Sequence, residues 1–421
     1  MKRNTDRKKT IRFRQLAVVF LFGLLTTGCD KKETEEKERE QVVLEVMVQT
    51  YGDADRVFRE ICESFTQETG ILISYSAPSE GYEEILKTRM AVNDMPDVWD
   101  THGWAVRRYK EYIRPLEDQS YTEQIDPLIR PFLEDKEGRL CAFPVGITVN
   151  GIVYNKTVLQ EAGIDPREIE TWDDLTAAAE TIAKMGIRPF ALGGSDKWSI
   201  GCCFLGLAGA YFDMEKITDA CDHTTWESWD EICQIMRSWK DKNLILEDSL
   251  QNTNLENGKA LGRGEAAFGF STGLVAYGLQ EKEDAEFGIM PYPAKKKGES
   301  RSIQIGEQIA FAVNKDTLYE EEALLFLKFL SRQESLKKIA DARKLPSGIA
   351  DIGPEKEQVK GITNLLKSEE ILKLPVFDRR YLPSGMWDTL YQEGQEIFYG
   401  SEDAALEAAE RLKKECQGDM E

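Results

Sequence analysis

Histidine is nearly absent from this chain. Among 421 residues, only His102 and His223 carry an imidazole. Because general acid–base catalysis most often relies on histidine, few catalytic centres of that kind can be built here. The sequence also has no G-x-x-x-x-G-K-[ST] loop and no G-x-G-x-x-G turn. Nucleotide chemistry that depends on either phosphate-binding loop therefore has no support.

Positive charge is also scarce. The chain carries 54 basic and 75 acidic residues, and its first 28 residues contain seven of the bases and one of the acids. The remainder therefore has a net charge of about −27. Nucleic acids and anionic lipid surfaces bind basic patches, so neither is expected as a ligand. The acidity mainly favours solubility.

The cysteines lack the C-x-x-C spacing that is typical of zinc sites. Besides Cys29 there are seven: Cys62, Cys141, Cys202, Cys203, Cys221, Cys233 and Cys416. An odd number precludes complete pairing within the chain. Most have apolar neighbours, which predicts buried free thiols; a single disulfide is one alternative. A metal cluster that adds His223 to Cys202, Cys203, Cys221 and Cys233 is another, but no metal or cofactor is predicted.

The apolar run near the N-terminus, Leu16 to Leu25, is too short to span a membrane. As a helix it would rise ~15 Å, half of a ~30 Å hydrocarbon core. Seven basic residues precede it and the small residues Thr27 and Gly28 follow, which is the order of a secretory signal. With Cys29 next, this stretch resembles the lipobox of bacterial lipoproteins, although Thr26 replaces the usual leucine. The alternative is an ordinary signal peptide with an incidental cysteine.

A charged segment follows the cysteine. Residues 30–40 hold six acids, four bases and no apolar side chain. Such a segment cannot bury enough surface to offset the entropy of ordering, so we expect it to be disordered. Acyl chains on Cys29 would hold the protein firmly, since each buried methylene contributes ~0.8 kcal/mol. The sequence thus predicts a signal peptide at 1–28, a lipidated tether at 29–41 and a body on the extracellular face of a bacterial membrane.

Strand and helix patterns alternate along the body. Residues 42–50 are apolar and β-branched, as in a buried strand, and residues 55–69 carry an apolar helical face. A second unit of this kind begins near Ala142, and the stripe from Trp226 to Trp239 is predicted to be core. The pattern predicts the α/β fold class with mostly parallel sheets flanked by helices. About 390 mature residues exceed what one core usually holds, so two lobes are expected.

Ligands of such sheets bind at the carboxyl ends of strands. Tyr51 and Asp53 follow the first predicted strand, and His102 and Trp104 follow the third. We therefore expect these four side chains to contribute to a binding site.

A series of motifs runs from about residue 44 to 415, nearly the whole mature chain. In order they are QETGILISY, NDMPDVWD, GRLCAFPVGITVNGIVYNKTVLQEAGIDP, TWDDLTAAAETIA, GRGEAAFGFSTG, GIMPYPA, IGEQIAFAVNKDT and EEALLFLKFLSRQESLKKIA. In kind and order they resemble the family 1 extracellular solute-binding proteins, the sugar receptors of ABC importers, and are similar to maltose-binding protein. The stretch from 142 to 183 is the most specific.

The resemblance implies a type II-like two-lobe fold whose lobes close on a ligand. The chain is expected to cross between lobes near 145–149, 304–308 and 348–353. The N-terminal lobe would comprise 42–147 plus 309–350, and the C-terminal lobe 148–308 plus 351–421. The protein would bind a sugar or oligosaccharide as a monomer and deliver it to the permease subunits of an ABC importer.

Sugars present apolar C–H faces to aromatic rings and hydroxyls to polar side chains. Trp387, in LPSGMWDTLY, aligns with a tryptophan that stacks on ligand in the family, and Trp198 follows a predicted strand. Glu307 lies at the second crossing. The other predicted contacts are Phe270, Thr272, Asn150, Tyr381 and Arg379. A ligand-facing Arg379 would favour an acidic sugar.

One motif favours an enzyme instead. Residues 269–273, GFSTG, match the G-x-S-x-G turn of α/β-hydrolases, with Ser271 as nucleophile. In that fold the histidine follows the serine, yet no histidine follows His223. The sequence therefore predicts a binding protein and no enzyme. A receptor that feeds a membrane sensor kinase is a further alternative, and a polyol or peptide ligand stays open.

Overall fold

The computed structural model describes residues 41–418, apart from 51, 79–80, 103–104, 106–108, 196, 218–219, 223–224, 246–247, 249–250, 350, 356 and 384. The predicted signal peptide, Cys29 and nearly all of the predicted tether lie outside the described residues. Within the described ranges, no helix is both long and apolar enough to cross a membrane.

A six-stranded sheet forms what we call the first lobe. β1 (Val43–Met47) lies parallel to both β2 (Leu72–Ser76) and β3 (Val98–Thr101). β12 (Ala310–Asn314) returns from late in the chain and runs antiparallel to β3. It also pairs with two short strands, β4 (Ile113–Arg114) and β5 (Phe143–Pro144). The α/β fold class is confirmed, but this sheet is mixed rather than mostly parallel because the returning strand runs against its neighbours.

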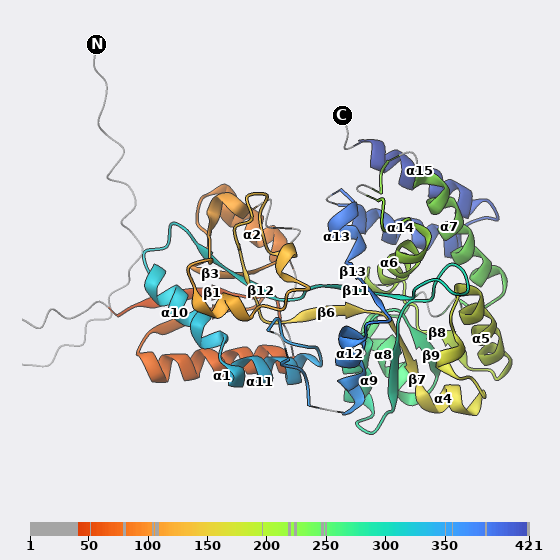
Figure 1. Ribbon diagram of the computed structural model, residues 1–421, viewed down its shortest axis with the longest axis horizontal. Coiled ribbons are helices and arrows are strands. Elements are labelled where there is room, and N and C mark those ends of the chain that lie inside the picture. The colour runs from red at the N-terminus through yellow and green to blue at the C-terminus, as the bar shows by residue number, and fades with distance from the viewer. Residues whose placement is uncertain are drawn as a thin grey trace, which may run out of the picture. The chain divides into compact units, whose positions relative to one another are not determined.

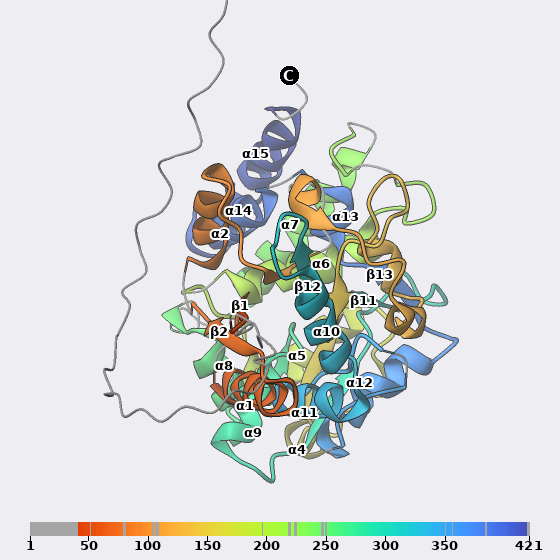
Figure 2. The same cartoon turned by 90° about the vertical axis from the view of Figure 1, so that its left-hand side faces the viewer.

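Helices α1 (Gly52–Thr69), α2 (Tyr82–Ala91), α10 (Glu320–Leu330) and α11 (Gln333–Arg343) complete the first lobe. α1 buries its predicted apolar face, and Gly70, with φ at 76°, directly follows its last residue. Phe65 of α1 packs edge-on against Phe326 of α10, with ring centroids 5.2 Å apart. Figure 2 looks at this lobe end-on and shows α1 beside α11. Single turns of 3₁₀-helix, η1 (Lys110–Tyr112), η2 (Ser120–Gln124) and η3 (Arg130–Phe132), connect β3, β4 and β5.

The second lobe contains a four-stranded sheet of order β10-β7-β9-β8. Its strands are β7 (Ile152–Asn155), β8 (Arg188–Phe190), β9 (Ala266–Gly269) and β10 (Phe287–Met290). β7 is antiparallel to both β9 and β10, and β8 is parallel to β9. This second sheet is therefore also mixed.

Helices surround these strands. Their bounds are α4 (Lys156–Glu161), η4 (Pro166–Glu168), α5 (Trp172–Lys184), α6 (Trp198–Tyr211), α7 (Trp226–Asp241), α8 (Asn254–Arg263), α9 (Leu274–Glu281), α12 (Glu357–Lys367), α13 (Phe377–Tyr381), α14 (Met386–Tyr399) and α15 (Ala404–Gly418). Thr171 caps α5 in a reciprocal capping box with Asp174. The apolar stripe of α7 is confirmed as core, because its members Trp229, Ile232, Cys233, Met236 and Trp239 are buried; Trp226, at the start of the helix, is half-buried.

Three strands lie between these groups. β6 (Ile147–Asn150) pairs antiparallel with β11 (Ser302–Glu307), and β13 (Leu372–Pro375) lies parallel to β11 on its other side. Figure 1 shows β6 and β11 between the helices of the first lobe and those of the second. These strands overlap two of the expected lobe crossings, 145–149 and 304–308. The lobe boundaries themselves stay predictions.

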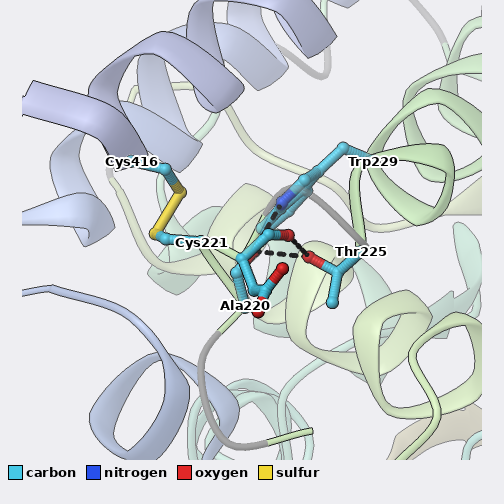
Figure 3. The surroundings of a disulfide bond; sticks show 6 residues. Ala220, Cys221, Thr225, Trp229 and Cys416 are labelled. Atoms are coloured by element: carbon cyan, nitrogen blue, oxygen red, sulfur yellow. Dashed lines mark hydrogen bonds between the residues drawn. A yellow bond between two sulfur atoms is a disulfide. The ribbon is translucent and has the colours of Figure 1, made fainter.

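One pair of cysteines departs from the expectation of free thiols. Cys221 and Cys416 form a disulfide that joins the turn before α7 to the last helix (Figure 3). The carbonyl of Ala220 accepts hydrogen bonds there from Trp229 Nε1 and Thr225 Oγ1. The other described cysteines are free and buried, as predicted. The alternative of a metal cluster is weakened because Cys221 is in the disulfide. His223, another of its proposed ligands, lies outside the described residues.

Candidate functional site

Two predicted aromatic residues meet on the second lobe. Trp198 is the first residue of α6, and Trp387 is the second residue of α14. Their ring centroids lie 5.4 Å apart, with the ring planes at 55°. Trp198 is 43% exposed, although large aromatic side chains are usually buried, and Trp387 is half-buried. We call this pair the indole platform.

The platform is held by its neighbours. Gly201 lies one turn into α6, and a Cβ there would come within 2.4 Å of the Trp387 ring, so the absence of a side chain lets that ring lie directly on the helix. Trp198 Nε1 donates a hydrogen bond of 3.1 Å to Ser271 Oγ in the turn after β9. Lys197 Nζ and Asp388 Oδ1, adjacent in sequence to the two tryptophans, form an exposed ion pair at 2.7 Å.

A second group of predicted residues meets at the end of β11. Glu307, 1% exposed, accepts a hydrogen bond of 2.7 Å from Arg379 Nη1 at its Oε1. The same Nη1 donates to the Glu307 carbonyl at 2.8 Å. His102, which directly follows β3, places Nδ1 3.7 Å from Glu307 Oε1. Side chains from the first lobe, β11 and α13 therefore converge on one carboxylate, which we call the polar cluster.

His102 is uncharged in this cluster. Burial, with smaller contributions from the positive charges of Arg379 and Arg343, lowers the pKa of His102 from 6.5 to about 3. A neutral imidazole offers one hydrogen-bond donor and one acceptor, the combination that a sugar hydroxyl can use. Arg343 Nε donates to Gln308 Oε1 at 2.7 Å, one residue beyond Glu307. The cluster thus contains donors and acceptors in fixed positions.

Other predicted residues lie elsewhere. Asp53 is exposed in the first turn of α1, where Arg56 is 3.8 Å away. Asn150 is buried at the end of β6, opposite Gln304, and Tyr381 packs 5.3 Å from Phe377. The described contacts join none of these three to the indole platform or the polar cluster. Tyr51 and Trp104 lie outside the described residues.

The structure corrects the prediction that Phe270 and Thr272 face a ligand. Phe270 is 1% exposed and stacks on Trp239 and Trp172, with ring centroids 5.8 and 6.3 Å away. Thr272 is 3% exposed and donates its hydroxyl to the carbonyl of Val149. Both side chains belong to the core because β9 leads the chain into the aromatic interior of the second lobe. Neither presents a surface to a ligand in this structure.

Sequence reasoning missed the supporting residues. Ser271 attracted notice as a nucleophile, yet its hydroxyl is 3% exposed and accepts hydrogen bonds from Trp198 Nε1 and the Gly273 backbone. Gly201 gave no signal, since a glycine within an apolar helix does not reveal what packs on it. Gln308 and Arg343 are 35 residues apart and meet only in the fold.

The comparisons with known proteins identify the family. The model of the family described as bacterial extracellular solute-binding protein matches residues 60–361. The chain belongs to this family. It is 30% identical over 396 residues to the melibiose/raffinose/stachyose-binding protein MelE of Bacillus subtilis, covering 90% of both chains. It is 23% identical to a multiple sugar-binding protein of Streptococcus mutans, covering 89% of each.

Solved structures of solute-binding proteins share the fold. A Bacillus licheniformis sugar transporter in complex with stachyose superimposes with a TM-score of 0.77 and 33% identity, covering 89% of this chain and 99% of that one. The binding protein MsmE of Bacillus subtilis, in an open conformation, gives 0.78 and 28%, covering 90% and 99%. The family assignment and the two-lobe fold expected from the motif order are thereby confirmed.

Proposed function

We propose that this solute-binding protein captures a sugar or oligosaccharide and delivers it to the permease of an ABC importer. The observation that carries the proposal is the indole platform, an exposed aromatic surface on a protein whose relatives are named for melibiose, raffinose and stachyose. Indole rings cover the apolar C–H faces of sugars. Trp387 and Trp198 would stack on the ligand.

The polar cluster would supply the hydroxyl contacts. Glu307, Arg379 and His102 come from different parts of the fold and meet at β11, a strand between the lobes. A ligand held there would contact both lobes, so its binding would favour the closed arrangement. Lobe closure about 145–149, 304–308 and 348–353 is part of this proposal. Asp53, Asn150, Tyr381, Tyr51 and Trp104 remain proposed contacts of the closed state.

The protein would act as a monomer anchored on the outer face of the cell membrane. Family membership supports an extracellular location. The lipid anchor rests on Cys29 and the sequence before it. A charged segment of about a dozen residues would let the body reach a permease while staying attached.

We further propose that the protein has no catalytic activity. Ser271 of the GFSTG motif is buried, and its hydroxyl accepts hydrogen bonds from the N–H groups of Trp198 and Gly273. A serine nucleophile needs an adjacent base. Absence of turnover of chromogenic glycosides by the purified protein is the expected result.

The decisive test is direct binding. The soluble body, residues 41–421, is titrated by calorimetry and by thermal shift with melibiose, raffinose, stachyose and arabino-oligosaccharides, and with polyols and short peptides as comparison classes. A ligand present at 100 times its Kd stabilises by ~2.7 kcal/mol, which raises the melting temperature by a few degrees. Binding of a peptide or polyol with no response to any sugar would refute the proposal.

A further inference from the structure

Arg379 is the cation that contacts Glu307 in the polar cluster, so its charge is paired. The guanidinium is 18% exposed, whereas the Glu307 side chain that accepts its Nη1 hydrogen is 1% exposed. A Cβ at Gly306 would lie 3.3 Å from the same Nη1, so the strand leaves just enough room for the arginine. The pairing is therefore built into β11 and α13. It reverses the expectation that a ligand-facing Arg379 favours an acidic sugar.

We infer that Glu307 determines the charge of the ligand: by compensating Arg379, it makes the site select uncharged glycans and reject those that carry a carboxylate. This inference rests on the proposed function. A guanidinium has five N–H donors, and Glu307 engages only Nη1 in the described contacts. Arg379 can thus donate other N–H groups to hydroxyl oxygens without presenting an uncompensated positive charge.

The surroundings support the same selection. His102, the other member of the polar cluster, adds no positive charge at neutral pH. Lys197, which precedes Trp198 in the sequence, is itself paired with Asp388. A sugar carboxylate near Arg379 would therefore lie close to the buried carboxylate of Glu307, and like charges placed together oppose binding. The acidic body as a whole repels anions in addition.

Glu307→Gln tests this directly. Glutamine has the same shape and can still accept the Arg379 hydrogen, so only the charge is removed. Binding is measured by calorimetry for raffinose and for its derivatives in which one primary hydroxymethyl group is a carboxylate. For each derivative, the readout is the ratio of its affinity to the affinity for raffinose. We expect the wild type to bind every derivative at least about 100-fold more weakly than raffinose. In Glu307→Gln, the affinity of at least one derivative relative to that of raffinose should rise about tenfold or more.

Two further variants test whether a shift in the ratio comes from the uncompensated charge of Arg379 or from the loss of a buried carboxylate in general. Glu307→Gln combined with Arg379→Gln removes both charges and should return the ratio to the wild-type value. Glu393→Gln is the matched control, because Glu393 is also a buried carboxylate paired with an arginine, Arg411, but joins α14 to α15. Its ratio should equal that of the wild type. An unchanged ratio in Glu307→Gln, or a shift that persists in the double variant, overturns the inference.

The outcomes also distinguish this inference from the proposed function. If the wild type binds raffinose and a carboxylated derivative within threefold of each other, the inference fails while sugar capture stands. If the wild type binds no sugar at all, the proposed function fails first. If Glu307→Gln does not fold, Arg379→Gln is the alternative test. This variant removes the cation that pairs with Glu307, so the affinity for a carboxylated derivative relative to raffinose must fall further. A rise in this relative affinity overturns the inference.

Discussion

The indole rings of Trp198 and Trp387 lie with their centroids 5.4 Å apart, although they begin helices from distant parts of the sequence. Both helices belong to the second lobe, so the two rings form one tilted surface on one side of the site instead of two facing walls. A single aromatic surface can cover one face of a sugar ring while leaving the opposite face for groups from the first lobe. His102, which follows β3 in the first lobe, is proposed as such a group.

Trp387→Ala should remove most of the ligand affinity. Central aromatic contacts typically contribute about 2–4 kcal/mol, so we expect a loss of at least thirtyfold in Kd. The side chain is half-buried, and the melting temperature without ligand should fall by a few degrees only. Calorimetry and thermal shift on the same samples measure both. Tyr399→Ala, at the other end of α14, is the control, because it removes a 52% exposed aromatic ring outside the site. A collapse of the unliganded fold in Trp387→Ala would make this residue core.

Gly201→Ala should weaken binding without touching the ligand. The added Cβ would lie 2.4 Å from the Trp387 ring, so the indole must move off α6, at a cost of about 1–3 kcal/mol. If this cost falls on binding, we expect a roughly five- to 150-fold rise in Kd. The intrinsic fluorescence of the platform should change as well.

The control for this variant is Gly361→Ala. A Cβ at Gly361, within α12, meets nothing closer than 4.0 Å. Alanine is the better helix former there, so the variant should gain about 0.5–1 kcal/mol of stability and keep its affinity. Equal losses of affinity in both glycine variants would show that helix stability, and not the position of Trp387, controls binding.

The fold was largely predictable because its signals are local. The apolar face of α1 and the stripe of α7 are each indicated by the spacing of apolar residues within one short segment of sequence. The relative direction of neighbouring strands was not predictable, because it depends on where a later part of the chain returns to the sheet. β12 follows β11 from the second lobe and enters the first sheet antiparallel to β3, which no local pattern indicates.

The site was predictable only in part, for a similar reason. Five of the predicted residues come together in the indole platform and the polar cluster: Trp198, Trp387, Glu307, Arg379 and His102. Their contact with a ligand stays a prediction. Phe270 follows a strand as well, yet its ring turns inward onto Trp239. A strand end places a residue at the correct edge of the sheet but does not decide which way its side chain points. The pairing of Cys221 with Cys416 likewise spans 195 residues and leaves no trace in spacing.

Cys416→Ser should destabilise the protein without affecting its ligand. Loss of a crosslink that closes a loop of 195 residues lowers the free energy of unfolding by up to about 5 kcal/mol in the chain-entropy model. The bridge joins α15 to the turn before α7 and includes no residue of the indole platform or the polar cluster, so the Kd should change less than twofold to threefold. Denatured, unreduced residues 41–421 should titrate five free thiols, and reduction should reveal two more. Seven thiols before reduction would contradict the disulfide.

Cys29→Ser tests the anchor. The lipobox resemblance requires a thiol at this position, so the variant should accumulate as unprocessed precursor and lose radiolabelled acyl chains. The control is Cys62→Ser, since Cys62 is a buried free thiol of the folded body and should not affect processing. Normal acylation of the Cys29 variant would reduce residues 1–28 to an ordinary signal peptide.

His102 should make the protein less stable in acid. Burial lowers its pKa to about 3, whereas the unfolded chain has its ordinary value of 6.5. Below pH 6.5 the unfolded state takes up a proton that the folded state does not, so the free energy of the unfolded state falls relative to that of the folded one. The stabilising contribution is therefore complete above pH 6.5 and is lost as the pH falls toward 3.

The measurement compares melting temperatures of the wild type and His102→Asn between pH 4 and pH 8. The variant lacks the buried imidazole, so its melting temperature should fall less steeply below pH 6.5, and the two curves should converge or cross in acid. Because His102 stays neutral throughout this range, its C2 proton resonance, assigned by its absence in the variant, should not shift between pH 5 and pH 8. Ligand affinity should be equally flat, since protonation of His102 cannot contribute there. A midpoint near 6.5 in the resonance would place the imidazole in solvent and remove it from the polar cluster.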